Sequence, residues 1–349
     1  MSQHETMRAI SLTAHGGPEA LVYRTDMPVP VPGRSEVLIK VGAAGVNNTD
    51  INTRIGWYSK GEGDEEDASW GGQALSFPRI QGADICGEVV GVGEGADSRL
   101  IGTRVLVEPC LREANGETLP SPWYIGSECD GGVADYVTVA ARHAYPVETA
   151  LSDSELASFP CSYSTAENML TRAQVTKNDT LLITGASGGV GSAAIQLAKA
   201  RGASVIAVAG DKKQQSVRDA GADRALVRGA SLEAALGENS VDVVIDLVGG
   251  EDWPELLTIL TPFGRYAVSG AIAGPIVELD LRTLYLKDQR FMGCTVLDDG
   301  VFSRLVGLIE EGDIKPLLAR SFALESLSEA QAFFLDKQFT GKLVIDMAL

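Results

Sequence analysis

Apolar residues in the first 148 positions alternate with polar ones over short runs bounded by glycine and proline. The candidate strands are residues 36–41, 86–92, 104–107 and 134–139. β-Branched residues between turn formers are typical of strands, and helical periodicity is scarce in this region. We therefore predict a mostly antiparallel β domain here.

Near residue 149 the pattern changes to an alternation of strands and helices. Ser152 and Glu155 have the spacing of a capping box, which marks the start of a helix. The strands and helices expected after it are residues 180–184, 190–200, 203–208, 211–220, 241–248, 264–269 and 291–296. This alternation predicts an α/β domain, in which a doubly wound parallel sheet is covered by helices on both faces.

The chain ends in a further candidate strand at residues 341–345. A terminal strand needs a partner for its backbone groups, and we expect it to return to the N-terminal β domain. The predicted domains are therefore a discontinuous β domain, residues 1–148 and 302–349, and an α/β domain, residues 149–301.

Composition and charge narrow the classes of function. Apolar residues make up 45% and charged residues 22% of the 349 residues, as in globular proteins. The 47 acidic and 29 basic residues give a net charge of −18, which disfavours nucleic acids and anionic membranes as partners. The sequence has no apolar run of the roughly 20 residues that span a bilayer. Five scattered cysteines without a C-x-x-C pair, and an N-terminus unlike a secretory signal, predict a cytoplasmic protein.

A glycine-rich segment between the strand at 180–184 and the helix at 190–200 is the strongest chemical signal. It reads A-x-G-x-x-G, a variant of the dinucleotide-binding fingerprint. Glycines allow a tight turn and a close approach to a pyrophosphate, and the following helix presents its N–H groups to the phosphates. We therefore predict a Rossmann-type sheet that binds a dinucleotide through Ala186, Ser187, Gly188, Gly189, Val190 and Gly191.

The same segment also fits the G-x-S-x-G nucleophile elbow of hydrolases, with Ser187 as the nucleophile. Such a hydrolase needs a histidine after the serine in the sequence. Because His4, His15 and His143 all precede Ser187, we interpret Ser187 as a hydroxyl of a phosphate-binding loop.

The end of the second strand indicates which dinucleotide is bound. NAD-dependent enzymes place an acidic residue there to bind the ribose hydroxyls, whereas this chain has Ala209 and Gly210, followed by Lys212 and Lys213. We interpret Asp211 as the N-cap of the next helix, with Gln214 completing a capping box, in preference to a ribose contact. Cations suit the 2′-phosphate, so we predict NADP(H) as the cofactor, bound near Gly210, Lys212 and Lys213.

The whole chain resembles the medium-chain dehydrogenase/reductase superfamily, in particular its zinc-independent quinone reductase and enoyl reductase branch. The resemblance rests on residues 45–50, 82–87, 129–136, 185–191 and 341–344. It implies that the β domain is GroES-like. The further cofactor contacts that it implies are Thr165, Leu247, Val248, Ser269, Gly270 and Lys342.

The last strand of the predicted sheet, residues 291–296, is apolar and leaves an edge. An apolar edge invites pairing with another chain, and a two-fold axis would continue the sheet into a second subunit. We therefore predict a homodimer, as is common among members of the branch that this chain resembles.

Zinc-dependent members of the superfamily carry a cysteine where Asn47 stands and a histidine where Ala83 stands. Only Cys161 matches their third ligand, and a catalytic zinc ion takes about three protein ligands. We therefore predict no metal; the alternative is an improvised site formed by Asp50, Asp84 and Cys161.

Without a metal, hydrogen bonds have to polarise the substrate carbonyl. This requirement suits hydride transfer to a quinone or an α,β-unsaturated carbonyl compound. Tyr58 matches the catalytic tyrosine of enoyl reductases, and two interpretations stay open: a proton donor or a lining of the cleft. Thr49 stands at the position of a relay hydroxyl, and Asn47 is placed to orient the substrate carbonyl.

The sequence thus predicts an NADPH-dependent, zinc-independent reductase of quinones or α,β-unsaturated carbonyl compounds. Two alternatives remain open: a zinc-type alcohol dehydrogenase with unusual ligands, and a non-catalytic NADPH-binding scaffold protein. The acidic segment at residues 61–67 is expected to be a solvated loop. It departs from compact members of the superfamily and leaves the substrate undefined.

Overall fold

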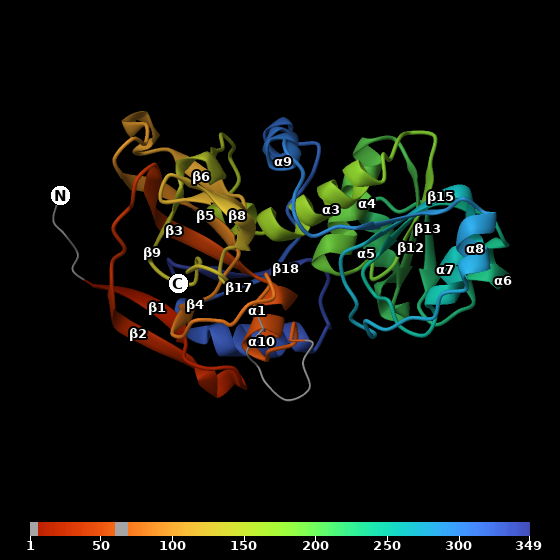
Figure 1. Cartoon of the computed structure of the whole chain (residues 1–349), viewed down its shortest axis with the longest axis horizontal. Helices are drawn as coiled ribbons and strands as arrows, with labels where there is room; N and C mark the ends of the chain where they lie inside the picture. The colour runs from red at the N-terminus through yellow and green to blue at the C-terminus, as the bar shows by residue number, and fades with distance from the viewer. Residues whose placement is uncertain (1–5, 60–68) are drawn as a thin grey trace. The chain divides into compact units, whose positions relative to one another are not determined.

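The computed structural model describes residues 6–59 and 69–349, so the acidic segment at 61–67 and His4 lie outside the described residues. The chain divides into two compact units (Figure 1). The first comprises Met1–Cys161 and Pro316–Leu349, and the second comprises Ser162–Lys315.

The first unit is built on a seven-stranded sheet that is antiparallel except for one pair. In spatial order its strands are β10 (Ala144–Pro146), β6 (Arg104–Val107), β5 (Asp84–Val92), β3 (Glu36–Val46), β18 (Lys342–Asp346) and β17 (Leu318–Phe322), with β9 (Tyr136–Ala140) also paired to β3. The terminal strand β18 runs antiparallel to β3, with Val344 opposite Gly45. The end of the chain therefore completes the sheet that its N-terminal part begins.

Smaller elements surround this sheet. They are the sheet of β2 (Leu21–Pro28), β1 (Thr6–Leu12) and β4 (Arg79–Ile80), the hairpin of β7 (Cys110–Ala114) and β8 (Glu117–Tyr124), and the helices α1 (Asn48–Arg54), α2 (Asp153–Leu156) and α10 (Leu327–Leu335). Along β3, Val37, Ile39 and Val41 are each at most 3% exposed, whereas Lys40 between them is exposed. This alternation fixes which face of the strand enters the core, because a slip by one residue would expose all three.

The second unit contains a six-stranded, entirely parallel sheet. Its order is β13 (Arg224–Val227), β12 (Ser204–Ala209), β11 (Thr180–Ile183), β14 (Val241–Asp246), β15 (Leu260–Val268) and β16 (Arg290–Gly293). The helices of this part of the chain are α3 (Pro160–Arg172), α4 (Gly189–Ala200), α5 (Gln214–Asp219), α6 (Leu232–Leu236), α7 (Trp253–Ile259), α8 (Leu281–Leu286) and α9 (Val301–Glu311). This is the strand order of a Rossmann fold, with the switch point between β11 and β14. The predicted fold class, a GroES-like β domain plus a Rossmann-type α/β domain, is confirmed.

The units divide at different residues from those predicted. The chain leaves the first unit after Cys161 rather than at 148, and returns at Pro316 rather than at 302. The capping box at Ser152 does begin a helix, α2, but Leu156 of this short helix is fully buried in the first unit. At the other end, α9 buries Phe302 and Leu305 within the second unit. The capping box of α2 marks where that helix begins, but it does not indicate the unit in which the helix packs. The N-cap of α9 is Gly300, which carries no side-chain signal either.

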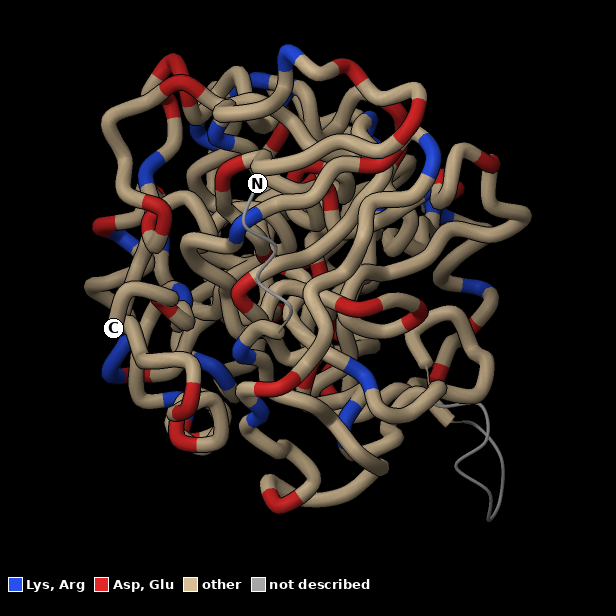
Figure 2. The backbone as a smooth tube through the Cα atoms, turned by 90° about the vertical axis from the view of Figure 1, so that its left-hand side faces the viewer, with Lys and Arg blue, Asp and Glu red and all other residues tan. Residues whose placement is uncertain are grey.

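Acidic and basic positions are interspersed over the face shown in Figure 2. As for membrane spans, no helix within residues 6–59 and 69–349 has the length and apolar character needed to cross a bilayer.

Candidate active site

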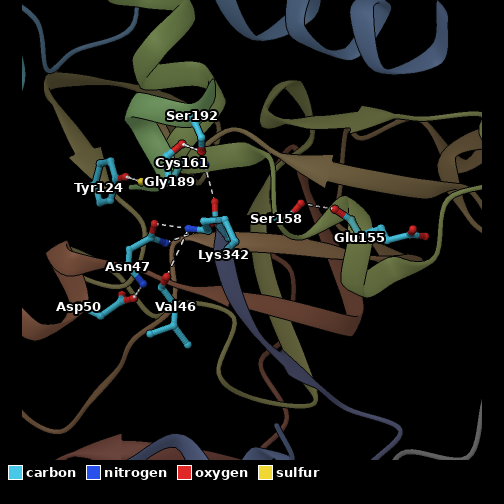
Figure 3. Close-up of polar contacts among 11 residues, drawn as sticks. Val46, Asn47, Asp50, Tyr124, Glu155, Ser158, Cys161, Gly189, Ser192 and Lys342 are labelled. Carbon is cyan, nitrogen blue, oxygen red and sulfur yellow. Dashed lines mark hydrogen bonds and ion pairs between the residues drawn. The ribbon is translucent and has the colours of Figure 1, made fainter. Parts of the chain in front are cut away.

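A buried ion pair joins Lys342 and Asp84 in the first unit, and Figure 3 shows the Lys342 ammonium with its contacts to Asn47 and Val46. Lys342 is 3% exposed and Asp84 is fully buried, and the Lys342 Nζ lies 2.7 Å from the Asp84 Oδ2. The same ammonium also donates hydrogen bonds to the Asn47 Oδ1 and to the Val46 carbonyl. Since these three acceptors use all three of its N–H groups, the ammonium holds Asn47 in place, and the cofactor contact predicted at Lys342 stays a prediction.

Asn47 is held from both ends of its amide. Its Nδ2 donates to the Asp84 Oδ2 at 2.8 Å, while its Oδ1 accepts from Lys342. Its extended backbone places it at the N-cap of α1, where its N–H donates to the Asp50 carboxylate at 2.8 Å. Burial raises the pKa of Asp50 to about 7, although this N–H favours the charged form. The N-cap geometry therefore fixes the backbone of Asn47, and the ion pair fixes its side chain.

Two hydroxyls stand next to Asn47. The Thr49 Oγ1 and the Tyr58 hydroxyl lie 2.9 Å apart, and both side chains are half-buried. Gly56, with φ +72°, lets the chain turn after α1 and bring Tyr58 back over the start of that helix. Burial raises the pKa of Tyr58, so its phenol is protonated at neutral pH. The structure thus brings the three predicted catalytic residues, Asn47, Thr49 and Tyr58, to one helix terminus.

Tyr124, which the sequence did not single out, contacts Cys161. Its hydroxyl lies 2.8 Å from the Cys161 Sγ, and burial raises the pKa of that thiol to about 12. Tyr124 is the last residue of β8, and its spacing in the sequence gave no signal of a role.

The improvised metal site of Asp50, Asp84 and Cys161 does not fit a zinc ion. The Cys161 thiol is hydrogen-bonded to the Tyr124 hydroxyl. The Asp84 carboxylate is already bound by Lys342, by Asn47 and by the Cys161 N–H. Over the described ranges, His, Cys, Asp and Glu residues form no group of three suited to holding a metal ion.

The glycine loop of the second unit has the geometry that a dinucleotide requires. Gly185 has φ +57°, and its carbonyl accepts the Gly188 N–H at 3.0 Å, which closes a tight turn before α4. A Cβ on Gly191 would lie 2.4 Å from the Gly185 carbonyl oxygen. The positions from Ser187 to Val190 are exposed or half-buried. A phosphate therefore has access to the N–H groups of the first turn of α4, which have no partner inside the helix.

The loops after β14 and β15 lie beside the glycine loop. A Cβ on Gly185 would lie 3.2 Å from the Val248 side chain, and one on Gly270 would lie 3.0 Å from the Leu247 carbonyl. Ser269 precedes Gly270 at the end of β15. The structure thus brings these predicted residues together at the carboxyl ends of the parallel strands. Thr165 lies half-buried on α3 of the same unit.

Two cations, Lys213 and Arg228, lie near the end of β12, and Arg228 was not identified from the sequence. A Cβ on Gly210 would meet no atom within 4 Å, and Lys212 is exposed. Lys213 is half-buried; burial and the nearby Arg228 guanidinium lower its pKa. Arg228 follows β13, a four-residue edge strand that was not predicted, and the Arg228 N–H donates to the Ala209 carbonyl at 2.8 Å. Two like charges are therefore held close together beside an open position.

The N-cap predicted at Asp211 is wrong. The segment Asp211–Lys213 forms a short 3-10 helix with Gly210 at its N-cap, and α5 begins only at Gln214. The Gln214 amide instead donates to the Ala209 and Leu226 carbonyls, at 3.0 and 3.1 Å. These two hydrogen bonds join the ends of β12 and β13 and take the place of the capping box expected at Asp211.

Two family models match the chain. The model described as "Alcohol dehydrogenase GroES-like domain" covers residues 33–149, and the model described as "Zinc-binding dehydrogenase" covers residues 189–311. Together with the fold, these matches place the chain in a family of oxidoreductases. The chain belongs to the medium-chain dehydrogenase/reductase superfamily.

Known members of the superfamily resemble the chain over nearly its full length. The quinone oxidoreductase of Homo sapiens is 28% identical, over 97% of either chain. The acryloyl-coenzyme A reductase of Metallosphaera sedula is 31% identical over 90% of this chain and 93% of that protein, and an NAD-dependent alcohol dehydrogenase of Sulfurisphaera tokodaii is 31% identical over 93% and 95%. Among solved structures, a putative alcohol dehydrogenase from Sinorhizobium meliloti 1021 shares 48% identity with a TM-score of 0.90, over 98% of this chain and 97% of that one.

Proposed function

We propose that this oxidoreductase reduces quinones or α,β-unsaturated carbonyl compounds with NADPH and without a metal ion. The observation that carries the proposal is the hydroxyl pair of Thr49 and Tyr58, 2.9 Å apart, beside an Asn47 that Lys342 and Asp84 hold in place. Relatives named for quinone and acryloyl-coenzyme A reduction support the same class of substrate.

The chemistry assigned to these side chains follows from where charge develops. When bound, reduced nicotinamide supplies a hydride, and negative charge then grows on the substrate's carbonyl oxygen. The Tyr58 phenol, protonated because burial raises its pKa, donates a hydrogen bond or a proton to that charge. Thr49 orients the phenol, and the Asn47 amide helps to position the carbonyl. Preorganised donors of this kind are a large part of enzymatic rate enhancement.

Apart from Lys342, the residues proposed to hold the cofactor belong to the second unit. The loop from Ala186 to Gly191 takes the pyrophosphate, while Leu247, Val248, Ser269 and Gly270 line the neighbouring loops. Lys213 and Arg228 take the 2′-phosphate at the open position beside Gly210, with Lys212 as an exposed cation nearby. An anion between Lys213 and Arg228 would relieve the repulsion that lowers the pKa of Lys213.

Replacing Lys213 and Arg228 by alanine is expected to weaken NADPH binding by about 1.5–3 kcal/mol, because a charge-assisted phosphate contact is lost. Affinity for NADH, which lacks the phosphate, should stay as in the wild type. Titration of nucleotide fluorescence measures both constants. Arg218→Ala, which removes an exposed arginine of α5, is the matched control and should change neither. Equal wild-type affinities for NADPH and NADH would contradict the assignment.

We also propose that the protein is a homodimer joined along β16. This strand is the edge of its sheet, and apolar side chains near it are exposed, among them Ile276 at 88%, Leu286 at 72% and Phe291 at 37%. Exposed apolar surface beside an open edge favours association with a second copy.

Sedimentation velocity at micromolar concentration is expected to show a species of twice the 36.8 kDa chain mass. Ile276→Asp with Leu286→Asp should shift it toward the monomer, because each introduces a charge into the apolar surface. Leu335→Asp, at a 52% exposed position of the first unit, is the control. A wild-type protein that sediments only as a monomer would rule out this dimer.

A further inference from the structure

Asp246, the last residue of β14, is a carboxylate with no exposed surface. Its Oδ1 accepts the Thr184 hydroxyl at 2.6 Å and the Val248 N–H at 3.0 Å, and its Oδ2 accepts the Tyr266 hydroxyl at 2.6 Å. The Gly249 N–H lies 3.3 Å from both oxygens. A buried carboxylate is costly to maintain unless donors surround it, and these contacts supply them.

The donors around Asp246 are themselves held in place. The Thr184 hydroxyl accepts the Leu247 N–H at 2.9 Å, and the Tyr266 hydroxyl accepts the Trp253 Nε1–H at 2.8 Å. Burial, together with the neighbouring carboxylate of Asp246, raises the pKa of Tyr266. The phenol therefore stays protonated and donates its hydrogen bond to Asp246. Along both branches of the network, each hydrogen bond is donated toward the Asp246 carboxylate.

The network reaches the three loops assigned to the cofactor. Thr184 directly precedes the glycine loop, and Asp246 begins the loop 247–250. That second loop is joined to the loop after β15, because the Val248 carbonyl accepts the Ala273 N–H at 2.9 Å and the Gly250 N–H donates to the Gly274 carbonyl at 3.1 Å. All three loops leave the carboxyl ends of β11, β14 and β15, where open α/β sheets bind their ligands.

We propose that Asp246 is a positioning residue that holds these three loops in the conformation that binds the nicotinamide cofactor. This inference rests on the proposed function, since it assumes that the loops bind a nicotinamide dinucleotide. Asp246 touches the loop backbone and needs no contact with the cofactor itself.

The carboxylate is needed because every neighbour is a donor. An alanine at this position would supply neither oxygen. The Thr184 hydroxyl, the Val248 N–H and the Tyr266 hydroxyl would then all lose their acceptor. The buried N–H groups of the loop 247–250 left unpaired would destabilise its present conformation.

The test compares Asp246→Ala, which removes both acceptor oxygens, with Tyr266→Phe, which removes a donor from the Oδ2 but leaves the Oδ1 bonds to Thr184 and Val248. We expect Asp246→Ala to weaken NADPH and NADH alike by about tenfold or more and to lower kcat, because small displacements of a site have large effects. Its Val248 and Gly249 amides should exchange hydrogen faster. Tyr266→Phe should lower the melting temperature yet leave both affinities within about twofold of the wild type.

The results distinguish a failure of the proposed function from a failure of the positioning role. A wild type that binds neither nucleotide overturns the proposed function itself. A wild type that binds while folded Asp246→Ala binds equally well, with unchanged amide exchange, overturns only the positioning role. If Asp246→Ala does not fold, Thr184→Val takes its place: it removes the hydroxyl between Asp246 and the Leu247 N–H, and unchanged nucleotide affinities in this variant also overturn the role.

Discussion

Replacing Lys342 by methionine is expected to lower the free energy of unfolding by about 3–5 kcal/mol, because removal of one partner leaves a buried charge uncompensated. Lys342 is 3% exposed and Asp84 fully buried, so water cannot take the place of the lost ammonium. Asn47 would also lose the hydrogen bond that holds its Oδ1. Urea unfolding followed by circular dichroism measures the change.

A second variant separates the charge from the packing. Adding Asp84→Asn to Lys342→Met removes the uncompensated carboxylate and should restore part of the lost stability, which a double-mutant cycle quantifies. Lys177→Met, at an exposed position, is the matched control and should be neutral. If Lys342→Met were as stable as this control, the ion pair would not be what holds the site together.

Tyr58→Phe is expected to lower kcat toward the lower end of the about 10²–10⁴-fold range of positioned proton transfer. The substitution removes only the hydroxyl that pairs with Thr49 at 2.9 Å and keeps the ring. Melting temperature and NADPH affinity should therefore change little. Thr49 and water share the role of donor and soften the loss. Steady-state kinetics with the best quinone or enone substrate provides the measurement.

Tyr285→Phe is the control for this prediction, since Tyr285 is 62% exposed on α8 in the second unit. It should leave kcat unchanged. A Tyr58→Phe enzyme that turns over at the wild-type rate would show that Tyr58 only lines the site and that the proton comes from elsewhere.

Most of the fold could be predicted from the sequence, because local signals and the tertiary structure agree. The apolar run at 241–248, the glycine loop and the terminal strand all have the expected conformation. β13 was missed because it has only four residues, Arg224–Val227, in which apolar and polar positions do not alternate. The unit boundaries also differed, since a capping box shows where a helix starts but not which core its apolar face joins.

The site was predictable only in part, for a related reason. Asn47, Thr49 and Tyr58 are close in sequence, and a turn brings them together. Lys342 pairs with Asp84, which is distant in the sequence, and Arg228 lies near Lys213 on a different segment. Contacts of this kind depend on strand register. The exposed Lys212 looked equivalent to Lys213 in the sequence, and only burial and the neighbouring Arg228 distinguish the two.

The measurement that tests the central claim most directly is NADPH oxidation by chelator-treated protein, with quinones, enones and enoyl thioesters as substrates. We predict oxidation by at least one of them at the same rate before and after chelation. A protein that binds NADPH but oxidises it with none of them would be a scaffold. Activity toward alcohols that chelation abolishes and Zn²⁺ restores would contradict the account, because it would require a metal site that Asp84, already bound to Lys342 and Asn47, does not provide.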